Sequence, residues 1–173
     1  RLVDVYPKRE LVVQYRETDL AFVSRLAEHL GVSFWVEARE GRDVVVFSDR
    51  NEGFSRPDPD VPVPFRPRGD GRDVYALEQR SRVVPTKHVV RDYNYRNPGL
   101  DLTATAELEG GSGSVVEYGA HFKDPAGGAR FARIRLEEQL CRSKTFRGKS
   151  DLPGLVVGSR VVLEGHPRGD IDL

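Results

Sequence analysis

Several features that mark particular classes of protein are missing from this sequence of 173 residues. It has a single cysteine, Cys141, so no disulfide can form within the chain. Its 27 basic and 27 acidic side chains cancel, which leaves no net charge to attract a nucleic-acid backbone or an anionic membrane surface. Apolar runs such as residues 44–47 are far shorter than the roughly 20 residues of a membrane helix. We therefore expect no nucleic-acid partner and no stable membrane anchor.

The sequence also lacks methionine and a basic-then-apolar leader. Both absences are typical of a segment taken from a longer polypeptide, so the chain is expected to be part of a larger protein. With 38% hydrophobic and 31% charged residues, the composition indicates folded domains rather than disorder.

Residues 18–30 have the pattern of a helix with one apolar stripe. Thr18 is placed to cap its first turn, and Gly31 is placed to end it. The stripe recurs every four residues and consists of Phe22, Leu26 and Leu30. A β-hairpin is predicted next, with strands at 32–37 and 44–48. We expect the hairpin face that carries Val32, Phe34 and Val36 to cover this stripe.

Residues 54–73 are rich in proline, which removes backbone donors and predicts an extended connector. Turn residues then separate four predicted strands of an antiparallel meander, at 74–84, 88–95, 100–107 and 115–122. A second helix is expected to begin at Asp124-Pro125. Its predicted apolar side is formed by Ala129, Ala132, Leu136 and Leu140. One more strand is expected at 161–163, with no closing element before Leu173.

Strands outnumber helices in this reading and do not alternate with them, which predicts an α+β fold with mostly antiparallel sheet and two helices. Three regions are expected. Residues 1–53 form a helix plus β-hairpin subdomain, residues 54–73 form the connector, and residues 74–173 form an antiparallel, barrel-like domain that is incomplete at its C-terminus.

No group of residues predicts an active site, a cofactor site or a metal site. The four histidines, which are far apart in sequence, lack the spacing of a metal-binding motif: His29, His88, His121 and His166. His29 lies near the C-terminal end of the first predicted helix, where a positively charged ring interacts favourably with the last carbonyl groups. Cys141 has no flanking signature of a nucleophile and is expected to be buried or half-buried on the second helix.

Three other motifs have simple structural explanations. Residues 110–113 lack the lysine of a phosphate-binding loop and are interpreted as a flexible hairpin tip. Arg-Gly-Asp, which can be an adhesion ligand, occurs at 68–70 and 168–170, where chance alone predicts roughly 0.2 copies, and we favour a chance occurrence of so short a motif. Aromatic residues within 91–95 and at Tyr118 suggest either a stacking surface for sugars or single strands, or ordinary cross-strand packing, which we favour.

Several segments, taken in order, resemble the VgrG family, the Rhs-associated spike proteins of type VI secretion. Residues 13–31 are similar to that family's helix signature, and the hairpin follows as expected. Similarity continues at 91–98, 132–138, 152–154 and 165–167. The segment at 117–119 differs, since Gly119 stands where the family has proline.

This resemblance implies a fold like the hub of contractile-phage baseplates. It also implies a homotrimer in the full-length protein, at the base of a membrane-puncturing spike that sits on a hexameric tube of Hcp subunits and helps to deliver effector proteins. Such a protein is assembled in the bacterial cytoplasm and then secreted through the type VI apparatus. The function is mechanical and requires no catalytic residue.

Our hypothesis from sequence is therefore a structural, non-catalytic spike component. Residues able to serve its core or interfaces include the helix stripe and the strand aromatics Tyr93, Tyr95 and Tyr118. A phage tail or baseplate hub is the alternative within the same class. The alternatives of a different class are an effector enzyme that uses His121 or Cys141, and an adhesion module that uses Asp70 and Asp170.

Overall fold

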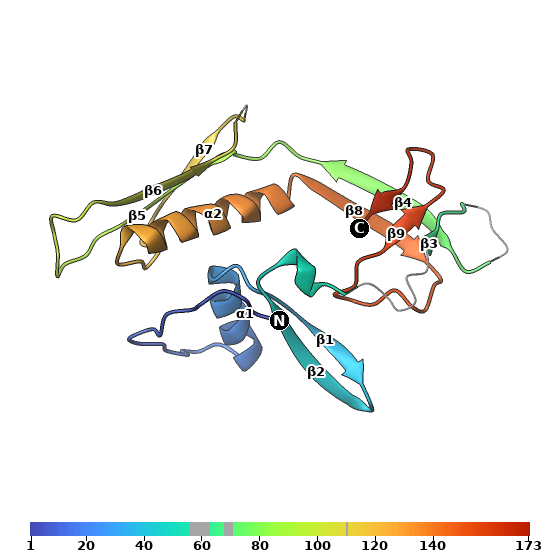
Figure 1. The fold of residues 1–173 in the computed structure, drawn as a ribbon, viewed down its shortest axis with the longest axis horizontal. Helices are drawn as coiled ribbons and strands as arrows, with labels where there is room; N and C mark the ends of the chain where they lie inside the picture. The colour runs from blue at the N-terminus through green and yellow to red at the C-terminus, as the bar shows by residue number, and fades with distance from the viewer. Residues whose placement is uncertain (56–62, 68–70, 110) are drawn as a thin grey trace. The chain divides into compact units, whose positions relative to one another are not determined.

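The computed structural model describes residues 1–55, 63–67, 71–109 and 111–173. The chain forms two compact units, and we call Arg1–Leu77 with Gly148–Leu173 unit 1 and Glu78–Arg147 unit 2. The elements follow the order α1 (Asp19–His29), β1 (Ser33–Arg39), β2 (Arg42–Ser48), a 3-10 turn (Asn51–Gly53), β3 (Val63–Pro64), β4 (Val74–Ser81), β5 (Lys87–Asp92), β6 (Leu102–Glu107), β7 (Ser114–Tyr118), α2 (Pro125–Cys141), β8 (Lys144–Ser150), β9 (Val162–Glu164) and β10 (Ile171–Asp172), as Figure 1 shows. The expected three-region division at residues 53 and 73 stays a prediction.

Unit 2 consists mainly of a three-stranded sheet, in the order β6-β5-β7, with α2 along one face (Figure 1). Asp124 begins the helix by accepting a hydrogen bond of 2.8 Å from the Gly127 amide, and Pro125 occupies the first turn. β5 pairs antiparallel with β6 and parallel with β7. The predicted meander is therefore wrong here, because the connection after β6 passes to the far side of β5 instead of forming a hairpin.

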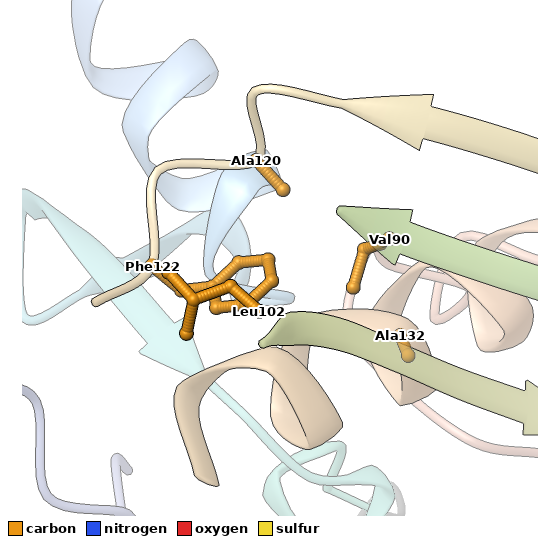
Figure 2. Close-up of a cluster of buried hydrophobic side chains, with 5 residues drawn as sticks. All are labelled: Val90, Leu102, Ala120, Phe122 and Ala132. Atoms are coloured by element: carbon orange, nitrogen blue, oxygen red, sulfur yellow. The ribbon is translucent and has the colours of Figure 1, made fainter. Parts of the chain in front are cut away.

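The core of unit 2 lies between the sheet and α2. Its buried members come from β5, β6, the segment after β7 and the helix, and they are Val90, Leu102, Ala120, Phe122 and Ala132 (Figure 2). Gly128 allows the helix to approach closely, since a Cβ atom there would lie 2.7 Å from the Phe122 ring and 3.1 Å from Ala104 Cβ. The predicted apolar side of α2 is thus wrong at Ala129, which is exposed, because the helix turns Gly128 toward the sheet.

Strands β4 and β8 pair with each other, and each has residues in both units. The Arg82 amide donates to the Ser143 carbonyl at one end of the pair, and the Asp151 amide donates to the Asp73 carbonyl at the other. Strand β8 was not predicted from the sequence, since most of its residues are exposed and three of the seven are basic. Its extended conformation follows from this pairing.

In unit 1, the predicted first helix is confirmed as α1. The Thr18 hydroxyl accepts a hydrogen bond of 3.2 Å from the Ala21 amide, and Gly31 adopts a φ of 69° just beyond the helix. The predicted stripe of Phe22, Leu26 and Leu30 is only half-buried, and Ala27 is the buried residue of α1.

The predicted hairpin is confirmed as β1 and β2, with Trp35 opposite Val46 and Phe34 opposite Phe47. That the face carrying Val32, Phe34 and Val36 covers the α1 stripe stays a prediction, but this face is not the more deeply buried one. Trp35 lies on the other face and is only 4% exposed, stacked on Phe54 with ring centroids 4.9 Å apart, whereas Val36 is 55% exposed. Packing around the large indole therefore decides which hairpin face is buried.

A second small sheet of unit 1 has the order β10-β9-β3, in which β3 runs parallel to β9. Its core consists of Val63, Val74 and Leu163. The expected strand at 161–163 is confirmed within one residue as β9, while β10, which pairs with it, was not predicted. Within the predicted connector 54–73, residues 56–62 and 68–70 lie outside the described residues.

Candidate assembly surface

The two faces of the unit 2 sheet differ sharply. On the face that meets α2, Val90 is fully buried and His88 is 3% exposed. The register places Val89 and Arg91 of β5 on the opposite face, which we call the open face. Its other members are Thr103 and Thr105 of β6 and Val116 and Tyr118 of β7. Val116 is 61% and Tyr118 is 72% exposed, so β-branched and aromatic side chains face outward.

The covered face contains a cluster of charged and polar side chains between the sheet and the helix. His88 Nε2 lies 3.4 Å from a Glu117 carboxylate oxygen, and Arg135 Nε lies 3.2 Å from the same oxygen. Arg135 also pairs with Glu138 at 3.2 Å. This cluster fixes β7 to α2 and neutralises Glu117, so it has a structural explanation and does not by itself indicate catalysis.

The other candidate histidines do not gather around this cluster. His166 packs edge-on against Phe65 with centroids 4.7 Å apart, and its Nδ1 accepts a hydrogen bond from the Arg168 amide. His121 is exposed, with a φ of 61°. Across the part of the chain that the structure describes, no group of three or more His, Cys, Asp or Glu side chains is arranged to hold a metal ion.

Cys141 is exposed at the end of α2, so the expectation of a buried or half-buried thiol is wrong. The predicted helix does continue to this residue, which is the last of α2. No helix among the described residues has both the length and the apolar character needed to cross a membrane.

The first Arg-Gly-Asp, at 68–70, lies outside the described residues. In the second, at 168–170, Gly169 has a φ of 91° and the Asp170 carboxylate accepts a 3.3 Å hydrogen bond from the Gly165 amide. The aspartate thus closes a turn after β9. Residue 110 of the glycine-rich segment 110–113 also lies outside the described residues. Strands β6 and β7 lie on opposite sides of β5, so the predicted hairpin between them is wrong.

The predicted aromatic residues are surface residues. Tyr93 is 58% and Tyr95 is 72% exposed, like Tyr118 on the open face. Arg91, which precedes them, is also exposed and lies opposite Tyr118 in the register. Cross-strand packing, the favoured explanation from sequence, is therefore wrong for Tyr93 and Tyr95, which lie beyond the end of β5. Tyr118 does lie opposite Arg91 across the two strands, but on an exposed surface. Val116 was not predicted to be a surface residue, since an alternating strand does not show which of its faces a helix will cover.

A carboxylate in unit 1 fixes the N-terminal residues to the hairpin. Asp49 accepts hydrogen bonds from the amides of Val3 and Asp4 and from the Tyr6 hydroxyl, at 2.8–3.2 Å. Burial raises the pKa of Asp49, but these hydrogen bonds outweigh it and lower the pKa to about 2. The carboxylate is thus held ionised as a structural anchor.

A sheet with one face covered by a helix and one open face does not by itself identify a function, but comparison with known proteins identifies the family. The profile of the phage tail baseplate hub (GPD) family matches residues 1–172. The chain belongs to the phage tail baseplate hub family.

The curated relatives of this chain include type VI secretion spike proteins. The type VI secretion system spike protein VgrG1a of Pseudomonas aeruginosa is 28% identical over 173 residues, which is 95% of this chain and 27% of the relative. The chain therefore spans about a quarter of the length of this spike protein. The resemblance to VgrG proteins expected from sequence is confirmed.

Two solved structures show the same fold. One is the E. coli c3393 protein, described as a component of the type VI secretion system with structural similarity to the T4 bacteriophage tail proteins gp27 and gp5. It gives a TM-score of 0.62 at 23% identity and covers 96% of this chain and 33% of that one. The other is the 43 kDa tail protein of prophage MuSo2 from Shewanella oneidensis, with a TM-score of 0.64 at 17% identity, covering 94% and 50%. The predicted α+β hub fold is confirmed.

Proposed function

We propose that this chain is part of a VgrG-like spike protein, in which it forms the trimeric base of a membrane-puncturing device. The base sits on a hexameric tube of Hcp-like subunits and helps to deliver effector proteins. The observation that carries this proposal is the hub-family match over 172 residues together with similarity to a type VI spike protein over 95% of the chain.

The structure supports a mechanical role in this device. Unit 2 presents a sheet with one face packed on a helix and the other face exposed, which suits contact with neighbouring subunits. Charged side chains on the covered face pair with each other and stabilise the fold. We propose that the protein is non-enzymatic, is assembled in the bacterial cytoplasm and leaves the cell through the type VI apparatus.

The solution mass of a longer protein that carries this chain together with its C-terminal neck and needle tests this proposal. Light scattering across a concentration series should give the mass of three copies. Deleting the segment equivalent to residues 1–173 in a bacterium with a type VI apparatus should reduce release of the tube protein to background. A stable monomer, or undiminished release, would contradict the proposal.

A phage tail hub is the second candidate, since the MuSo2 prophage tail protein shares the fold. Co-purification separates the two, because a spike base should bind a hexameric Hcp-like tube and a phage hub should bind a phage tail-tube protein. Two further variants test the remaining alternatives. An enzyme should lose turnover when His121 and Cys141 are replaced by alanine, and an adhesion module should lose cell binding when Asp70 and Asp170 are replaced by glutamate.

A further inference from the structure

The outer edge of β7 is an unprotected strand edge. Among the described residues, β7 pairs with β5 on one side and with no strand on the other. Folded proteins usually block such an edge with charged side chains, proline, a bulge or a covering segment. Residues 114–118 contain no proline, and their one charged residue, Glu117, faces α2, where it is paired with Arg135. The edge is therefore open to a further strand.

The hydrogen-bond pattern shows which backbone groups of β7 point outward. The Gly119 amide donates to the Arg91 carbonyl at 2.9 Å, and the Gly113 carbonyl accepts from the Lys87 amide at 3.3 Å. Odd-numbered residues of this strand therefore face β5. Since backbone groups alternate along a strand, the N–H and C=O groups of Ser114, Val116 and Tyr118 point to the open edge.

The same chain contains a strand-like segment without a strand partner. Residues 11–15, Leu-Val-Val-Gln-Tyr, are rich in residues that favour strands and carry no charge. They belong to no helix or strand, and within the described part of the chain they make no backbone–backbone hydrogen bond. Their apolar side chains are exposed, with Leu11 at 79%, Val13 at 54% and Tyr15 at 70%.

We propose that Leu11–Tyr15 of one copy adds as an antiparallel strand to the β7 edge of a second copy. Antiparallel pairing is favoured because it is the commoner and slightly more stable arrangement. It places Val13 opposite Val116 and Leu11 opposite Tyr118, so that apolar side chains adjoin on the open face. The β1-β2 hairpin is a less suitable acceptor, since it carries charged residues toward its turn.

The electrostatics of the two segments are compatible with this contact. The donor segment has no charged side chain, and the acceptor strand has only Glu117, which Arg135 and His88 approach on the covered face. Because donor and acceptor are different surfaces, the contact is head-to-tail, and repeated copies close into a ring when the rotation permits. The inference rests on the proposed function in expecting copies to associate, and it adds the surfaces that meet.

Proline substitutions test the contact while leaving the fold intact. Val116→Pro removes an N–H that points away from β5, a position where an edge strand tolerates proline. Val13→Pro removes a donor N–H that faces β7 in the proposed register, whereas Val12→Pro removes one that faces away and serves as the matched control. Val116→Thr keeps both the N–H and the branched side chain. Circular dichroism and thermal melting confirm that each variant is folded.

Light scattering of the 173-residue chain across a concentration series measures the effect. We expect Val13→Pro and Val116→Pro each to weaken association at least about tenfold, an effect of ~1.4 kcal/mol, and the two controls to associate like the parent chain. An equal mixture of Val13→Pro and Val116→Pro should form dimers and nothing larger, because each copy retains the surface that the other lacks. Amides 11–15 and 114–118 of the parent should become protected from hydrogen exchange as concentration rises.

Monomers at every concentration, or proline variants that associate like the parent, would overturn the inference. So would a Val12→Pro variant as defective as Val13→Pro, or a mixture that stays monomeric. The proposed function is tested separately by the mass of the longer protein and by tube release. If that protein is trimeric and the proline variants have no effect, only the strand contact is wrong; if the chain pairs head-to-tail and tube release is unchanged by deletion, only the function is wrong.

Discussion

Unit 2 and unit 1 are built in different ways. Unit 2 is a continuous stretch, Glu78–Arg147, whose sheet and helix share one core. Unit 1 joins Arg1–Leu77 to Gly148–Leu173, and its sheet pairs β3 with β9, about one hundred residues later in the chain. This difference indicates that unit 2 depends mainly on contacts between residues close in sequence, whereas unit 1 forms only when its N-terminal and C-terminal segments come together. Variants confined to one unit should therefore affect the two units unequally.

Phe122→Ala is expected to have the largest effect. The Phe122 ring is 5% exposed and fills the core between the sheet and α2 (Figure 2), so its removal should destabilise unit 2 by about 3–5 kcal/mol. Urea unfolding followed by the helical circular dichroism signal reports mainly α2, the longer helix, while fluorescence of Trp35, the one tryptophan, reports unit 1. The helical signal should be lost first. Tyr93→Ala is the control, and coincident transitions in Phe122→Ala would show that the units unfold together.

Gly158→Ala tests unit 1 in the same way. Gly158 has a φ of 82°, and a Cβ atom there would lie 2.2 Å from Trp35 Nε1. Overpacking against the indole and backbone strain together should destabilise unit 1 by about 2–3 kcal/mol. The Trp35 fluorescence transition should move to lower urea, with the α2 signal unchanged. Gly154→Ala, where nothing lies within 4 Å of the added atom, should behave like the parent, and equal losses in both variants would contradict this account.

Substitutions at the two helix N-caps should cause smaller losses of stability, of similar size in the two units. Thr18→Ala removes the acceptor for the Ala21 amide in unit 1, and Asp124→Ala removes the acceptor for the Gly127 amide in unit 2. Each change should cost about 1 kcal/mol in its own unit, with Asp124 slightly more important because its charge also favours the positive end of the helix. Thr18→Ser and Asp124→Asn should restore most of the stability. A loss of the same size after these conservative changes would show that capping is not the cause.

Local features of the fold could be predicted from sequence, and long-range ones could not. Thr18 and Asp124 predict where the two helices begin, because helix capping depends on residues that are neighbours in the sequence. By contrast, β8 has three basic residues in seven and is a strand only because β4 pairs with it. The parallel pairing of β7 with β5 was missed for the same reason, since nothing within residues 114–118 specifies a partner.

The candidate surface shows the same limit. Tyr118 could be selected from the sequence because it is aromatic, whereas Val116 could not be recognised as exposed. Which face of an alternating strand is covered depends on where α2 packs, and the direction of the backbone groups depends on the register with β5. The resemblance to VgrG proteins supplied the family, whereas only the three-dimensional arrangement shows the unprotected edge.

The smallest expected effect is a change in how the stability of unit 1 depends on pH in the acid range. Hydrogen bonds from Val3, Asp4 and Tyr6 outweigh burial and lower the pKa of Asp49 from 3.8 to about 2 in the folded state. Because the pKa of Asp49 is lower in the folded state, its ionised carboxylate stabilises unit 1 at pH values above its pKa in the unfolded chain. This stabilisation is lost as the pH falls toward about 2, since the unfolded chain binds the proton first. Unit 1 of the Asp49→Asn variant should therefore lose less stability between about pH 5 and pH 2 than the parent, measured by urea unfolding with Trp35 fluorescence. An identical acid dependence in both proteins would mean that Asp49 does not anchor the N-terminal residues, and a change in the α2 signal would place its effect outside unit 1.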